Sequence, residues 1–120
     1  MSKSSEHPTE KELLKSVLEP LLEDFQYWFG RSRTLLESEQ MSFLTAQEQA
    51  LLLERVVRSL QEVQTAQMLF QATDGSAGID SRMLLPWHQL VAECWNLAQK
   101  RREHKNHPSQ IHQRSQQDGI

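Results

Sequence analysis

Cys94 and His88 are the side chains of this sequence best suited to act as a nucleophile or a base. The neighbours of Cys94 one helical turn away are apolar and would raise its pKa, so we interpret it as a buried structural cysteine. His88 follows Trp87 and has no identifiable nucleophile nearby, so we interpret it as a surface histidine rather than a general base. Pairing of His88 with Glu93 is disfavoured, since residues five apart share a helical face poorly. The residues therefore predict a protein that is not an enzyme.

Motifs that bind metals or phosphate groups are missing from the sequence. It has no Glu-x-x-His pair of the kind that holds two metals in a helical bundle, and no His-Glu-x-x-His segment. One cysteine can form neither an internal disulfide nor a cysteine-based zinc site. The glycine-containing loop at 74–78 lacks the lysine of a phosphate-binding loop. We expect no cofactor and no metal.

An aromatic cluster followed by arginines is the strongest candidate for a binding site. It comprises Phe25, Tyr27, Trp28, Phe29, Arg31 and Arg33. Aromatic residues beside arginines occur in interface hot spots, in nucleic-acid stacking sites and in membrane-surface anchors. The competing interpretation places the aromatic side chains in the core and leaves the arginines in solvent. We predict that a partner binds through Tyr27, Trp28, Arg31, Arg33, Trp87 and His88.

Charge is distributed unevenly along the 120 residues, whose net charge is −3. Residues 100–120 carry +3, whereas residues 1–99 carry −6. A basic end can contact nucleic acid, an anionic membrane surface or an acidic partner, although small clusters of this kind are often only solvated. The acidic remainder would repel a polyanion, so the nucleic-acid signal is not strong.

Three amphipathic helices must position these residues. A capping box at Thr9 opens a helix whose apolar stripe runs from 14 to 29 and continues at 35 and 36. Pro20 lies inside that stripe and predicts either a kink or two helices that meet there. A second capping box at Thr45 opens a helix of about 40 Å that lasts to Gly75, which we expect in a left-handed conformation. Pro86 is expected in the first turn of the last helix.

The predicted fold is all-α: an antiparallel bundle of three long helices, the first kinked near Pro20, with disordered termini. The domain is expected over 9–105, between a disordered segment 1–8 and a disordered polar tail 106–120. Two copies could also dimerise to complete a fourth side of the bundle. No apolar run reaches the roughly 20 residues that cross a bilayer, and the first residues lack the apolar centre of a secretory leader. With a single cysteine, these features lead us to expect a soluble cytoplasmic protein.

Three segments resemble a small family of cyanobacterial proteins that is known only as a domain of unknown function. They are residues 18–29 (LEPLLEDFQYWF), residues 65–75 (TAQMLFQATDG) and residues 86–91 (PWHQLV). The resemblance covers about residues 12–98. It implies a cytoplasmic protein of a photosynthetic bacterium, and it brings no catalytic residue with it.

We therefore expect a non-enzymatic helical module, an adaptor or regulator that binds another protein through a helix face. The alternative is peripheral binding to nucleic acid or to an anionic membrane surface through the basic segment 100–105. The two differ in their response to salt, because binding to nucleic acid weakens linearly on a log–log scale as salt rises.

Overall fold

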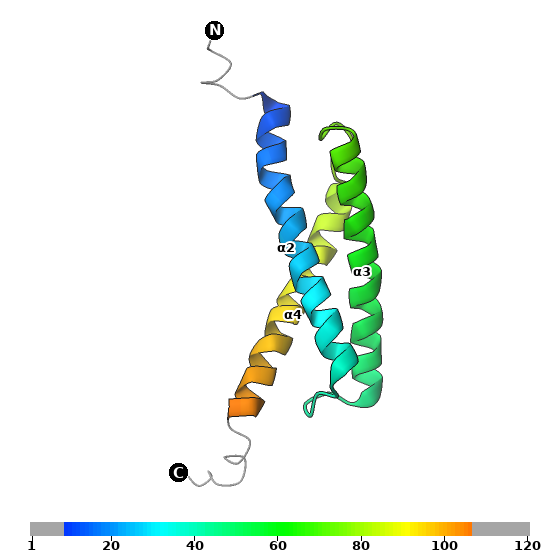
Figure 1. The fold of residues 1–120 in the computed structure, drawn as a ribbon, viewed down its shortest axis with the longest axis vertical. Helices are drawn as coiled ribbons and strands as arrows, with labels where there is room; N and C mark the ends of the chain where they lie inside the picture. The colour runs from blue at the N-terminus through cyan, green and yellow to red at the C-terminus, as the bar shows by residue number, and fades with distance from the viewer. Residues whose placement is uncertain (1–8, 107–120) are drawn as a thin grey trace.

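The computed structural model describes residues 9–106, and these form three long helices with no strand among them (Figure 1). Helix α2 spans Glu10–Ser38, α3 spans Ala46–Ala72 and α4 spans Ser81–Asn106. The prediction of an all-α fold with three long helices is confirmed. The predicted disorder of 1–8 and of 107–120 lies outside the described residues, and Asn106 belongs to α4 rather than to the tail.

Both predicted capping boxes are present. The Thr9 hydroxyl accepts a hydrogen bond from the Glu12 amide at 3.1 Å, and the Thr9 amide donates to the Glu12 carboxylate at 3.0 Å. Thr45 and Glu48 repeat this arrangement at 3.0 and 2.9 Å. Each box satisfies amides that have no partner within the first turn, so α2 and α3 begin where the sequence predicts.

The prolines do not end either helix. Helix α2 continues through Pro20 and Gly30 as one element, so the alternative of two helices meeting at Pro20 is wrong. A kink at Pro20 stays a prediction. Pro86 was expected in the first turn of the last helix, but α4 begins five residues earlier at Ser81. The earlier start follows from Asp80, whose carboxylate accepts from the Arg82 amide at 2.9 Å and whose carbonyl accepts from the Met83 amide at 2.9 Å.

The end of α3 is fixed by a left-handed turn that also contacts α2. Gly75 has φ of +84°, as the sequence predicts, and its amide donates to the carbonyl of Phe70 at 2.7 Å. A Cβ at Gly75 would lie 2.7 Å from a side-chain carbon of Lys15, so glycine is required for space as well as for conformation. The Lys15 ammonium reaches the carboxylate of Asp74 at 2.6 Å. This ion pair ties the first half of α2 to the end of α3.

Helix α2 packs against both other helices, and α4 crosses it (Figure 1). Early residues of α2 contact late residues of α3, as in Lys15 with Asp74, so these two helices run in opposite directions. Helices α2 and α4 run in the same direction, since Phe25 packs on Trp87 and Glu39 pairs with Arg101. The core between them contains Leu22, Phe25, Phe29, Leu36, Met41, Val56, Leu60, Val63, Phe70, Trp87, Leu90, Val91, Cys94 and Leu97.

A buried glutamine holds the connection between α2 and α3. The Gln49 side chain is 6% exposed, and its amide nitrogen donates to the carbonyls of Leu36 and Glu39 at 2.9 and 2.8 Å. Its amide oxygen accepts from the Met41 amide at 2.8 Å. A glutamine that looks like an ordinary helix former on a solvent face thus satisfies three backbone groups of the connection.

Part of the predicted apolar stripe of α2 is not buried. Leu14 and Val17 are 53% and 59% exposed. The first turns of α2 extend beyond the start of α4 (Figure 1), so the helix that covers Phe25 and Trp28 does not cover them. The predicted apolar stripe is therefore open to solvent at its beginning.

Candidate functional site

The candidates for catalysis do not come together in the structure. Cys94 is buried, and burial raises the pKa of its thiol although a hydrogen bond with Ser32 opposes the shift. The ring of His88 contacts Phe25 of α2 edge to face at 5.3 Å. Glu93 instead pairs with Arg55 of α3 through two hydrogen bonds of 2.8 and 2.7 Å. His88 and Glu93 are therefore engaged with different helices.

Within residues 9–106, no group of three or more histidine, cysteine or acidic side chains could hold a metal ion. None of the three described helices combines the length and the apolar character needed to cross a bilayer.

Trp87, predicted to contact a partner, lies in the core instead. It is 2% exposed and packs edge to face on Phe25 with ring centroids 5.5 Å apart. Its indole nitrogen donates to the carboxylate of Glu62 at 3.1 Å, so its polar atom is satisfied inside the molecule. Trp87 is therefore not available to a partner at the surface. His88 is exposed, and its ring contact is with Phe25 rather than with Tyr27 or Trp28.

Three of the other candidates, Tyr27, Trp28 and Arg31, meet on an open surface where α2 and α4 cross. Tyr27 is 56% exposed, and its ring contacts that of Trp28 edge to face at 5.2 Å. The guanidinium carbon of Arg31 lies 5.5 Å from the centre of the Trp28 ring, a cation–π arrangement. The structure adds Trp95 of α4, which meets Trp28 edge to face at 6.0 Å. We call these four residues the aromatic–arginine surface.

Trp95 is the member that the sequence interpretation missed. It is 52% exposed, although it continues the apolar stripe of the last helix. Trp95 lies at the edge of the apolar stripe rather than at its centre. The buried positions of α4 include Trp87, Leu90, Cys94 and Leu97. The spacing His88–Trp95, two helical turns, could have indicated a second face directed to the side of α2.

Arg33, by contrast, is not part of this surface. Its guanidinium pairs with Glu37 of the same helix at 3.2 Å, and both side chains are about half exposed. Residues two apart on a helix point in different directions, so Arg31 and Arg33 cannot serve one ligand together.

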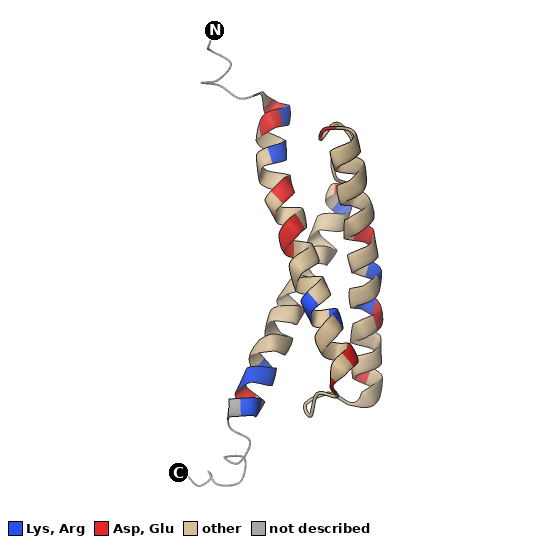
Figure 2. Cartoon of the chain, viewed as in Figure 1, with Lys and Arg blue, Asp and Glu red and all other residues tan. Residues whose placement is uncertain are grey.

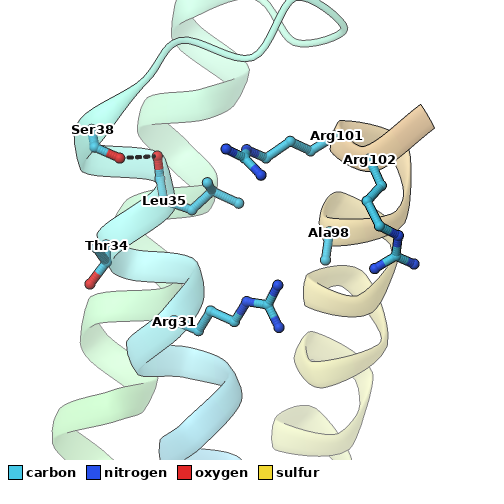
Figure 3. A pocket seen from close by; sticks show the side chains of 7 residues that line it. All are labelled: Arg31, Thr34, Leu35, Ser38, Ala98, Arg101 and Arg102. Carbon is cyan, nitrogen blue, oxygen red and sulfur yellow. Dashed lines mark hydrogen bonds between the residues drawn. The ribbon is translucent and has the colours of Figure 1, made fainter. Parts of the chain in front are cut away.

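Further along α2, over residues 31–38, this helix and α4 line a cleft of about 350 Å³, which we call the arginine cleft. Its lining residues are Arg31, Thr34, Leu35, Ser38, Ala98, Arg101 and Arg102 (Figure 3). Arg31 extends from α2 toward α4, and Arg101 extends from α4 toward α2 (Figure 3). Leu35 and Ala98 supply an apolar part of the lining, so cations and apolar groups share one opening.

Only part of the positive charge in the arginine cleft is neutralised by the chain itself. Arg101 donates to the carboxylate of Glu39 from Nε at 2.8 Å and from Nη2 at 3.2 Å. This hydrogen bonding holds the pKa of Glu39 below its usual range and raises that of Arg101. Among the described residues, neither Arg31 nor Arg102 forms an ion pair. Two uncompensated guanidinium groups therefore remain.

The basic segment 100–105 does not form one continuous cationic stripe. Lys100 lies over the Phe43 ring at 5.9 Å from its centre, while Arg101 pairs with Glu39. Figure 2 shows that its basic residues lie at the end of α4, whereas acidic residues are spread along the first half of α2. The described cations of this segment thus face different neighbours.

Three long helices, with aromatic and cationic side chains exposed where α2 and α4 cross, define a small all-α protein. The chain belongs to the family described as "Protein of unknown function (DUF2605)", whose model matches residues 8–103. The resemblance to a family of unknown function is thereby confirmed. Neither the curated proteins nor the solved structures compared with the chain gave a match.

Proposed function

We propose that this protein is a non-enzymatic helical module that binds another protein through the aromatic–arginine surface. The observation that carries the proposal is the contact of Trp28 with Trp95 across two helices, at a place where Tyr27 and Trp95 each leave about half of their surface open. Tryptophan, tyrosine and arginine are the residues enriched in interface hot spots. The resemblance noted above leads us to propose the cytoplasm of a cyanobacterium as its setting.

The arrangement favours a protein partner over a stacked nucleobase. Trp28 contacts Tyr27 and Trp95 edge to face, so the rings form a corrugated surface rather than parallel platforms. Side chains of a partner can fill such a surface, whereas base stacking needs open ring faces. The face of Trp28 is further occupied by the guanidinium of Arg31.

The alternative, binding of nucleic acid or an anionic membrane through 100–105, has less support. Of its basic residues, Arg101 is neutralised by Glu39 and Lys100 lies against Phe43. The net charge of −6 over residues 1–99 would oppose approach of a polyanion.

The test compares Trp95→Ala and Tyr27→Ala with a matched control, Met68→Ala, which removes an apolar side chain of 70% exposure from α3. The tagged full-length protein is used to capture proteins from nuclease-treated lysate of the source cells, and recovery is quantified by mass spectrometry. We expect one protein to be recovered by the wild type and the control and to be lost with both surface variants. Equal recovery with all variants would refute the proposal.

Sedimentation over a range of concentrations tests whether the partner is a second copy of this chain. Thermal melts of all variants accompany both measurements, so that loss of binding is separated from loss of fold.

A further inference from the structure

We propose that the arginine cleft receives an acidic side chain of the partner, held between Arg31 and Arg102, so that the partner segment is an acidic amphipathic helix. This inference rests on the proposed function and names the chemistry of its partner. The juxtaposition that carries it is two guanidinium groups, from different helices, that line one cleft and have no carboxylate partner among residues 9–106.

The positive charges that line the cleft favour an anionic occupant. Arg31 lines the cleft from α2 and Arg102 lines it from α4, and like charges that share a cleft repel each other. A carboxylate placed between them would convert that repulsion into two charge-assisted hydrogen bonds, which are stronger than neutral ones. The cleft is thus complementary to a negative charge that the described residues do not provide.

The neighbouring ion pair sets the limits of the site. Glu39 binds Arg101 with two hydrogen bonds, which fixes that guanidinium at the end of the cleft. The Glu39 carboxylate also repels further negative charge beyond that point. An occupant with one or two localised charges is therefore favoured over a polymer that carries a charge on every unit.

The lining argues for a protein ligand. Leu35 and Ala98 present apolar groups beside the guanidinium groups. A glutamate or aspartate side chain brings both methylene groups and a carboxylate, so its apolar and charged parts match this lining. The volume of about 350 Å³ accommodates side chains of that size.

The distance to the aromatic–arginine surface gives the spacing required of the partner. Trp28 and Leu35 are seven residues apart on α2, which corresponds to about 10 Å along the helix. A partner helix lying along α2 would therefore present an apolar side chain to Trp28 and Trp95 and an acidic one seven positions away to the cleft. Both chain directions of the partner satisfy this spacing.

A charge-reversal selection tests the inference without knowledge of the natural partner. The probe is a display library of alanine- and lysine-based helical peptides randomised along one face. It is selected against the wild-type chain, against R31E/R102E, and against the matched control R33E/R58E, which reverses two exposed arginines outside the cleft. For the wild type and the control, we expect enrichment of a large apolar residue with Asp or Glu seven positions away. For R31E/R102E, we expect Lys or Arg at that second position.

The affinity of one selected peptide for each variant then measures how much the carboxylate and the two arginines contribute to binding. Loss of its acidic residue, or of both arginines in R31Q/R102Q, should weaken binding about tenfold or more, since each removes charge-assisted hydrogen bonds. The R33E/R58E control should bind as the wild type does. Circular dichroism melts of every variant show whether the fold is kept, and the neutral pair R31Q/R102Q keeps the test valid if the reversed pair unfolds.

The outcomes separate this inference from the proposed function. Enrichment of an apolar residue that is lost in Trp95→Ala, with no acidic preference, would overturn the carboxylate site while supporting the binding surface. Selection that is unchanged in Trp95→Ala would refute the proposed function itself. Binding of oligothymidylate or of phosphatidylserine vesicles that is lost in R31E/R102E, in place of peptide enrichment, would overturn the inference in favour of a phosphate ligand.

Discussion

The indole of Trp95 on α4 meets the indole of Trp28 on α2 edge to face, with ring centroids 6.0 Å apart. Trp87, eight residues earlier on α4, is 2% exposed and points into the core, whereas Trp95 is 52% exposed. One helix thus contributes one tryptophan to stability and another to the surface. The two positions can be distinguished in solution.

Single-tryptophan proteins should report this difference directly. The variant W28F/W87F, which keeps Trp95, should emit at longer wavelength and be quenched by acrylamide several-fold more strongly than W28F/W95F, which keeps Trp87. The reason is that water and quencher reach an indole that is half exposed and are excluded from one in the core. Fluorescence spectra and quenching constants provide the measurement. Similar quenching of both proteins while they remain folded would contradict the arrangement.

Replacement of Gln49 should destabilise the fold far more than its helix propensity suggests. Gln49→Ala removes three hydrogen bonds and leaves buried backbone groups of the connection without partners, which costs about 1–3 kcal/mol for each unsatisfied group. The expected loss is therefore at least about 2 kcal/mol in urea unfolding. Gln47→Ala, at an exposed position two residues earlier, should change the free energy of unfolding by less than about 0.5 kcal/mol. Equal effects of the two substitutions would show that the three Gln49 hydrogen bonds contribute nothing to stability.

Acid should remove the contribution of the Glu39–Arg101 pair. The hydrogen bond from Arg101 lowers the pKa of Glu39 in the folded state, so the pair stabilises the fold above the ordinary carboxyl pKa of about 4.3, and this contribution is lost as pH falls through the lowered value. The difference in unfolding free energy between the wild type and Glu39→Gln should thus be largest near neutral pH and shrink under acid.

The control for this titration is Glu103→Gln on α4, which removes an exposed carboxylate. Its stability should follow the wild-type profile in shape. A difference between wild type and Glu39→Gln that stays constant from neutral to acidic pH would argue against the ion pair.

The thiol of Cys94 should resist modification in the folded protein. It is 1% exposed, and burial raises its pKa, so both access and the thiolate fraction are low. Reaction with a disulfide reagent should be slow in buffer and should accelerate through the urea unfolding transition. Fast reaction of the native protein at neutral pH would mean that the α4 core opens readily, and would revive Cys94 as a reactive group.

The sequence predicts the helices well because local rules determine them. The capping boxes at Thr9 and Thr45 and the glycine at position 75 act through neighbours a few residues away, and all three are present. At the start of α4, only the place of Pro86 was wrong: a proline suits a first turn, but the hydrogen bonds of Asp80 start the helix earlier, at Ser81.

The candidate site was predicted only in part, because exposure depends on how the helices cross. Tyr27, Trp28 and Arg31 do meet. Trp87, which was expected at the surface, is buried, and Trp95 is exposed in its place. Both tryptophans lie on or beside one apolar stripe, and periodicity does not reveal which edge of the stripe a crossing helix leaves open. The arginine cleft needs residues some 70 positions apart, and no local pattern brings Arg31 and Arg101 together.

The first turns of α2 extend beyond the start of α4, so the two halves of α2 differ in how well they are shielded from solvent. Leu14 and Val17 gain little from burial, and the Lys15–Asp74 ion pair at the surface adds only a weak restraint. Phe25 and Phe29, in the second half of the helix, are buried. Amide hydrogens of the first turns should therefore exchange with solvent by local opening, while those of the second half should exchange only when the whole domain unfolds. Helix α2 is continuous in shape but forms two units in its exchange behaviour.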